Sequence, residues 1–164
     1  MATNQDQIPI LQQMLWSAHQ VVMGSIDAIT EPEIRQVPAP GEWTVAQLMS
    51  HIAEIEYFWM EKAVLITKES VPNITRSAVE NDRRAAAVVD RAGDSLEEYI
   101  RSLAAANESA VVTTGKISPG DLTILGHRGE NSPITVEGVV RFLATHMKEH
   151  AHQIIESRGP INRR

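Results

Sequence analysis

The sequence predicts an all-α fold, a four-helix bundle with one additional short helix and a long loop before the last helix. Apolar residues recur at spacings of three and four along several long segments, which is typical of amphipathic helices. Residues that favour helix starts precede most of these segments, and no segment has a convincing strand pattern. Because the chain has 164 residues and neither an internal repeat nor a clear linker, we expect one domain over residues 1–164.

The first helix is expected from Ile8 to Ile29, where apolar residues share one helical stripe. Pro32 ends this segment, because proline lacks the backbone N–H that a helix interior needs. Residues 37–41 follow as a loop, since they are too rich in proline and glycine for regular structure.

The second helix carries the most complete start signals of the chain. Thr44 is a good N-cap, and Gln47 three residues later completes a capping box. Trp43 before the cap and Leu48 in the first turn have the spacing of a hydrophobic staple. We therefore expect a helix from Thr44 to about Ile66.

Similar signals define the remaining elements. A short helix is expected over residues 77–92 and a longer one over residues 95–111, each beginning with a serine and a glutamate three residues later. Residues 112–133 contain several glycines and prolines, so they are predicted to form a long loop, including the weakly strand-like stretch 111–114 at its start. A threonine then caps the last helix, which we expect over residues 135–157.

Composition excludes several classes of function. The net charge is −6 and no basic run precedes the final two residues, which argues against nucleic acid as a partner. The chain has no cysteine, so any metal ligands must be His, Asp, Glu or water. The first seven residues are polar and no apolar run approaches the roughly 20 residues of a membrane span, so we expect a cytoplasmic protein without a membrane partner.

Two histidines in the last predicted helix are the most informative residues. His146 and His150 are four positions apart, so both project from the same helix face, and Gln153 follows one turn later. A buried imidazole needs a partner, and either a shared metal ion or an ordinary hydrogen bond to a carboxylate or carbonyl would supply it. Gln153 is a candidate to bind a ligating imidazole or a metal-bound water; its alternative role is a polar residue near the helix end.

A third ligand is expected on the second predicted helix. His51 lies at the boundary of the apolar face there, and bundle metal sites are assembled from side chains of facing helices. Three histidines would leave a fourth metal position open for water or substrate. Glu54, one turn beyond His51, is a candidate base or orienting group, whereas Glu149 projects about 100° away from His150 and is a weaker candidate. The alternative for both glutamates is a solvated surface carboxylate.

Three segments resemble the DinB-like proteins. They are the stretch PGEWTVAQLMSHI at 40–52, the lead-in at 126–136, and HMKEHAHQI at 146–154. The resemblance covers most of the chain in order and spacing. It implies an up-down-down-up four-helix bundle, a homodimer, and a divalent metal, commonly zinc or nickel, held by residues that correspond to His51, His146 and His150. Where many members have Arg-Gly, this chain has Ala151-His152, and His152 should point away from the metal.

The resemblance also suggests an activity. Members with known reactions include S-transferases and isomerases that use bacterial low-molecular-weight thiols, and some hydrolases. We therefore expect a mononuclear metal-dependent enzyme, S-transferase-like, that acts on a small-molecule substrate. The alternatives are a metal-dependent hydrolase and a non-enzymatic stress or interaction bundle. An accessible pocket over the three histidines would favour an enzyme.

Overall fold

The computed structural model describes residues 4–159. Both ends of the domain expected over residues 1–164, including the final arginine pair, therefore lie outside the described residues. No helix in the described part is both long and apolar enough to cross a membrane.

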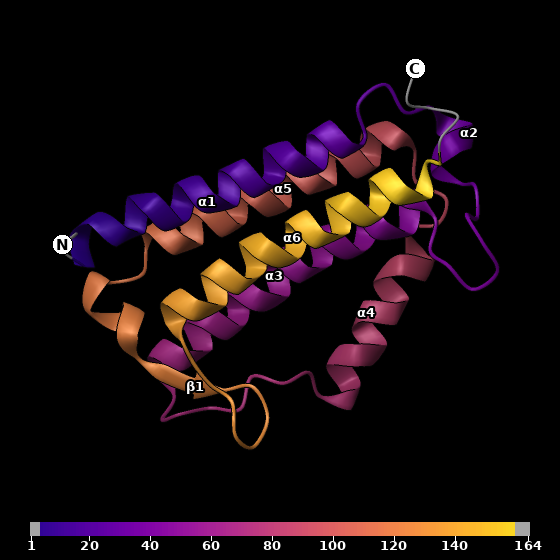
Figure 1. Cartoon of the computed structure of the whole chain (residues 1–164). Coiled ribbons are helices and arrows are strands. Elements are labelled where there is room, and N and C mark those ends of the chain that lie inside the picture. Colours follow the sequence, from indigo (N-terminus) through magenta and orange to yellow (C-terminus); the bar gives the residue numbers. More distant parts are fainter. Residues whose placement is uncertain (1–3, 160–164) are drawn as a thin grey trace.

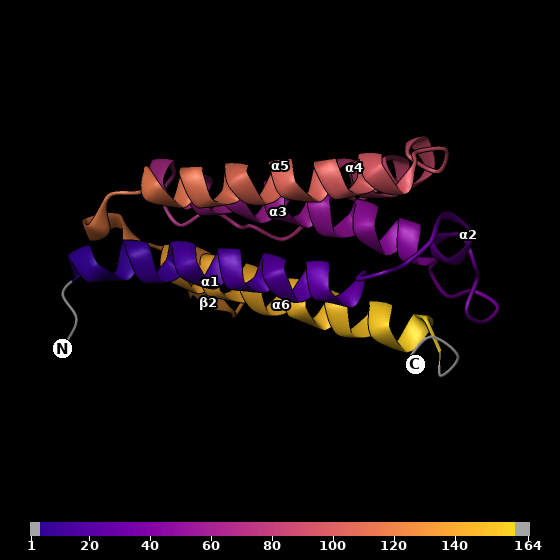
Figure 2. The ribbon, with the colours of Figure 1, turned by 90° about the horizontal axis from the view of Figure 1, so that it is seen from above.

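Four long helices form the bundle: α1 (Asn4–Ser25), α3 (Val45–Lys68), α5 (Leu96–Gly115) and α6 (Val136–Ser157). Each packs against two others, in the pairs α1–α6, α3–α6, α3–α5 and α1–α5. The chain runs up in α1, down in α3 and α5, and up again in α6 (Figure 1). Seen from above, α3 and α5 form one layer and α1 and α6 the other (Figure 2). This confirms the predicted all-α four-helix bundle.

The additional short helix, α4 (Ala78–Asp90), connects α3 to α5. Because α3 and α5 run in the same direction, the chain must return along the bundle between them, and α4 is the helical part of that return (Figure 1). An ion pair of 2.6 Å between Lys62 and Glu80 ties α4 to α3. Val88 is the buried residue of α4, so this helix is attached at the edge of the core.

Four of the five predicted helix starts are confirmed to within one residue, whereas the first helix begins at Asn4, four residues before the predicted Ile8. Thr44, Ser77 and Ser95 each accept a hydrogen bond from the backbone N–H three residues on, and the backbone N–H of each cap donates to a side-chain oxygen of the glutamine or glutamate there. Thr135 caps α6 by accepting from the Gly138 N–H at 2.9 Å. These short-range contacts explain why the starts are readable from sequence.

The loop predicted from residue 112 is wrong at its beginning, because α5 continues to Gly115. β-branched residues have low intrinsic helix propensity, so 111–114 looks strand-like in isolation. In the bundle, the buried Thr114 hydroxyl donates to the carbonyl of Ala110 at 2.8 Å, within the helix. Packing against α1 and α3 therefore overrides the local preference.

Four small elements of the described chain were not predicted. The first helix ends at Ser25 instead of Ile29, and α2 (Glu31–Ile34) follows with Pro32 in its first turn, where a missing N–H costs nothing. After the 3₁₀ helix η1 (Pro119–Thr123), strands β1 (Leu125–His127) and β2 (Pro133–Thr135) pair antiparallel. Strands of three residues are too short to show an alternating pattern, which is why sequence reasoning missed them.

Candidate metal centre

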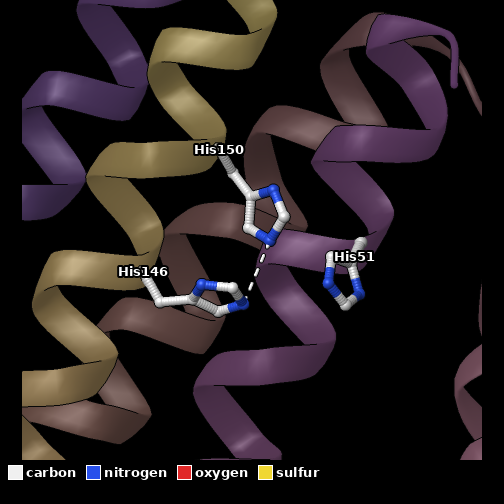
Figure 3. A group of neighbouring side chains, drawn as sticks. All are labelled: His51, His146 and His150. Carbon is white, nitrogen blue, oxygen red and sulfur yellow. Dashed lines mark hydrogen bonds between the residues drawn. The ribbon is translucent and has the colours of Figure 1, made fainter. Parts of the chain in front are cut away.

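His146 and His150 lie one turn apart on α6, with ring centroids 4.5 Å apart. Their Nε2 atoms face each other at 3.2 Å (Figure 3). The side chain of His146 is 28% exposed, and His150 is half-buried, so solvent reaches the pair. The helical i, i+4 spacing thus produces the side-by-side arrangement expected from the sequence.

Hydrogen bonds at the far side of each ring define which nitrogen carries the proton. Nδ1 of His146 lies 3.0 Å from Oε2 of Glu149, and Nδ1 of His150 lies 3.1 Å from Oε1 of Gln153. With these two oxygens as acceptors, the contacts assign the hydrogen to each Nδ1, and a ring in that tautomer has its lone pair at Nε2. Two lone pairs facing each other at 3.2 Å repel unless a cation, either a proton or a metal ion, lies between them.

His51 faces this pair from α3. It is only 5% exposed, and its ring centroid lies 4.7 Å from that of His150 and 6.4 Å from that of His146. Its Nδ1 lies 3.5 Å from Oε2 of Glu54 without forming a hydrogen bond, and its Nε2 is available for a ligand. The structure therefore brings together the three histidines that the sequence singled out (Figure 3).

The donor set suits a divalent transition metal. One nitrogen from each histidine lies within 4.8 Å of the others. Two imidazoles bound to one tetrahedral zinc ion have their nitrogens about 3.4 Å apart, close to the separation of the α6 pair. Each ring of that pair also donates its other N–H to an oxygen, which is the usual arrangement around metal-ligating histidines.

Burial keeps the imidazole of His150, one of the candidate ligands, neutral. Burial, reinforced by the neighbouring histidines, lowers the pKa of His150 to about 4, although Gln153 acts in the opposite direction. The ring is therefore unprotonated at neutral pH, which is the form that binds a metal.

Glu54 is neither a solvated carboxylate nor a free one. Arg76 donates two hydrogen bonds to it, at 2.7 and 2.9 Å. Burial pulls the pKa of Glu54 upward, but contacts with His51 and Arg76 outweigh it and hold the pKa below its usual value. Glu54 is thus placed to orient His51 through Nδ1, and it is already engaged by a guanidinium. Arg76 comes from the segment before α4, so its role was not readable from local sequence.

Gln153 lies where the sequence placed it, against a ring of the pair. Glu149, the weaker candidate, instead touches the other ring: it is three residues from His146, and the i, i+3 spacing brings its carboxylate to Nδ1. In the sequence, the helical position of Glu149 was compared only with that of His150, and the contact with His146 was therefore missed.

The rings of Phe142 and Trp59 lie beside the histidines, and we refer to these two rings as the aromatic floor. Phe142 stacks on His146 with centroids 5.3 Å apart, and Trp59 lies 4.9 Å from Phe142. On the other side, Trp43 meets His51 edge-on at 5.0 Å. A cavity of about 370 Å³ opens next to the centre, between α3 and α4, and its lining includes Glu54 but none of the three histidines.

The other three histidines stay outside the cluster. His152 is exposed and pairs with Glu156 at 3.4 Å, which confirms that it points away. His19 on α1 is half-buried, and burial lowers its pKa. His127 lies in β1, where its backbone bonds to Pro72 and Ile74.

An up-down-down-up four-helix bundle with three histidines converging from two antiparallel helices defines a bundle protein with a candidate mononuclear metal centre. The chain belongs to the DinB superfamily, whose family model matches residues 15–154. That range includes all three histidines. The family resemblance expected from the sequence is therefore confirmed.

Two solved structures share the fold. YfiT from Bacillus subtilis, described as a probable metal-dependent hydrolase with an unusual four-helix bundle topology, is 16% identical, with a TM-score of 0.74 over 93% of this chain and 86% of that chain. A conserved protein from Enterococcus faecalis is 18% identical, with a TM-score of 0.65 over 92% of this chain and 94% of that chain. No curated protein matches the chain.

Proposed function

We propose that the chain is a mononuclear metal-dependent enzyme in which His51, His146 and His150 hold a divalent ion, zinc or nickel, and a small-molecule substrate takes the open position. The facing Nε2 atoms of the α6 pair carry this proposal, because their Nδ1 atoms are committed as donors and the lone pairs need a cation between them. The partial exposure of that pair supports a site that substrates reach, in contrast to a closed structural site.

The reaction we propose is S-transfer from a low-molecular-weight thiol. A divalent ion bound there would lower the pKa of a bound thiol or water. Both carboxylates that touch the histidines, Glu54 and Glu149, approach at Nδ1 and so lie behind the rings. We assign both carboxylates the role of orienting the imidazoles, and the proposal uses no separate base at the open position. A thiol that releases its proton to solvent on binding would need no such base, and its sulfur would then attack an electrophilic carbon while the leaving group departs with its electron pair.

Hydrolysis is the second candidate. It is supported by the fold shared with YfiT, which is described as a probable metal-dependent hydrolase. The same open position would then hold water in place of a thiol. A non-enzymatic bundle would need neither an open position nor reactive ligands.

Metal analysis of the purified chain tests the site first. We expect close to one equivalent of zinc or nickel in the wild type and its loss in a His146→Ala, His150→Ala variant. His152→Ala is the matched control, since it removes an exposed histidine from the same helix and should leave the metal in place. Wild-type protein that takes up neither metal after reconstitution would refute the proposal.

Reaction class is tested on the metal-loaded protein. Thiols paired with an electrophile and, separately, a panel of esters and amides would be followed for product. We expect thiol-dependent turnover that the double variant lacks. Turnover of esters or amides without thiol would instead identify the hydrolase.

We also propose the homodimer that the family resemblance implies. Trp16 on α1 is 51% exposed and offers apolar surface for a second copy. Sedimentation velocity of the wild type and Trp16→Ala would test this: a monomer in the wild type would refute it.

A further inference from the structure

Arg128 stands at one end of the aromatic floor. It follows β1 at the start of the β1–β2 turn, and its backbone N–H donates to the carbonyl of Ser132 at 2.7 Å. Its guanidinium carbon lies 4.1 Å from the centroid of the Phe142 ring and 5.3 Å from that of Trp59. The residue is exposed, so the donor edge of the guanidinium is available to a ligand.

Unlike Arg76, which lies over the Phe58 ring, Arg128 has no acidic partner in the described part of the chain. Arg76 lies 3.7 Å from the centroid of Phe58, and its charge is compensated by the bidentate contact with Glu54. Within residues 4–159, Arg128 forms no ion pair and its side chain donates no hydrogen bond to protein. Stacking on two rings holds the group at modest energetic gain and leaves its charge unmatched.

One ring separates this free charge from the candidate metal ligands. Phe142 lies between Arg128 and His146, with the rings of Phe142 and His146 stacked at an interplanar angle of 20°. A molecule whose reactive end sits at the histidines can therefore lay an apolar segment along Phe142 and reach Arg128 with its other end.

We infer that the substrate carries a carboxylate and that Arg128 binds it. This inference rests on the proposed metal-dependent function and names its substrate class. A guanidinium presents a planar fork of donors that matches a carboxylate bidentately. A single uncompensated cation balances a single negative charge, so a monoanion fits better than a phosphate dianion. Arg128 is thus a specificity-determining residue for substrates that have an apolar stretch between reactive group and carboxylate.

Binding of thiol probes tests this without turnover. Mercaptoacetate and mercaptohexanoate, each with its neutral primary amide, would be titrated calorimetrically into the zinc-loaded protein. The thiol end of every probe is expected to occupy the metal, and each amide lacks the negative charge, so the ratio of acid affinity to amide affinity isolates the effect of that charge. We expect wild-type protein to bind mercaptohexanoate about tenfold more tightly than its amide, because one charge-assisted contact is added.

Variants of Arg128 test whether this residue causes the preference for the carboxylate probe over its amide. Arg128→Gln should abolish the preference for the carboxylate while zinc uptake stays close to one equivalent, and Arg128→Lys should retain part of the preference. Arg101→Gln is the matched control, since Arg101 is an exposed arginine on α5 with a 67% exposed side chain. Equal affinity for acid and amide in the wild type, or a preference that survives in Arg128→Gln, would overturn the inference.

Failure of the proposed function gives a different pattern. Protein without a metal site would show no zinc by elemental analysis and would bind neither amide, in the wild type and in every variant. That result would overturn the metal-dependent function and this inference with it. Zinc uptake with intact amide binding, but without a carboxylate preference, would overturn the role of Arg128 alone.

Discussion

Glu56 on α3 makes the stability of this bundle depend on pH. The residue is 0% exposed, one carboxyl oxygen accepts a hydrogen bond from the Asn107 side chain at 3.0 Å, and the other oxygen has no partner in the described part of the chain. The same Asn107 amide also donates to the carbonyl of Leu15, at 3.1 Å. Burial raises the pKa of Glu56 to about 8, against the lowering effect of Asn107.

The sign of the effect follows from linkage. In the unfolded chain Glu56 ionises near its ordinary value of 4.5, whereas in the folded chain it stays neutral up to about pH 8. Its contribution to stability is therefore fully present below the unfolded pKa, is lost as the pH rises, and levels off above the folded pKa. The difference between the unfolded pKa of 4.5 and the folded pKa of about 8 corresponds to a contribution of about 5 kcal/mol to the free energy of unfolding. About 3 kcal/mol of this contribution is already lost at pH 7.

Glu56→Gln removes the ionisation and keeps an oxygen for Asn107 to donate to. The new amide N–H groups lack partners, at a cost of about 1–3 kcal/mol. At about pH 9 the removed ionisation penalty exceeds that cost, so the variant should be more stable than wild type by about 2 kcal/mol or more. At about pH 5 the order should reverse.

Urea unfolding followed by circular dichroism, with chelator present to exclude metal effects, measures the free energy of unfolding of both proteins. The quantity of interest is their difference as a function of pH, which cancels groups common to both. Glu108→Gln, an exposed carboxylate on α5, is the control and should track wild type. A wild-type minus Glu56→Gln difference that stays constant between about pH 5 and about pH 9 would refute the reasoning.

Two further predictions concern a contact at the candidate metal centre and one close approach between a glycine and a side chain. Gln153→Ala removes the acceptor from His150 Nδ1, so metal affinity should fall roughly tenfold to a hundredfold in a chelator competition; unchanged affinity would count against any orienting role. Gly126→Ala would place a methyl carbon 2.8 Å from Cγ1 of Ile66, which should destabilise the fold by about 1–3 kcal/mol in urea unfolding. Gly24→Ala meets nothing within 4 Å and should not destabilise; equal effects of the two would contradict the steric argument.

The sequence was sufficient to predict an element's boundary where contacts within one helical turn determine that boundary. Thr44 caps α3 through atoms three residues away, so the start of that helix was predictable. The end of α5 was not, because the local pattern of residues 112–115 does not show that Thr114 is buried within the bundle. The short strands depend on pairing across the β1–β2 turn and on the backbone contacts of His127 with a distant segment.

The candidate site divides in the same way. By itself the sequence determined that His146 and His150 share a face, since i, i+4 geometry is a property of any α-helix. Only the tertiary structure decided that His51 lies beside these two histidines and that Arg76 donates two hydrogen bonds to Glu54. Helix-to-helix contacts depend on how the apolar faces of the whole chain are buried together, and that choice is not encoded in any one segment.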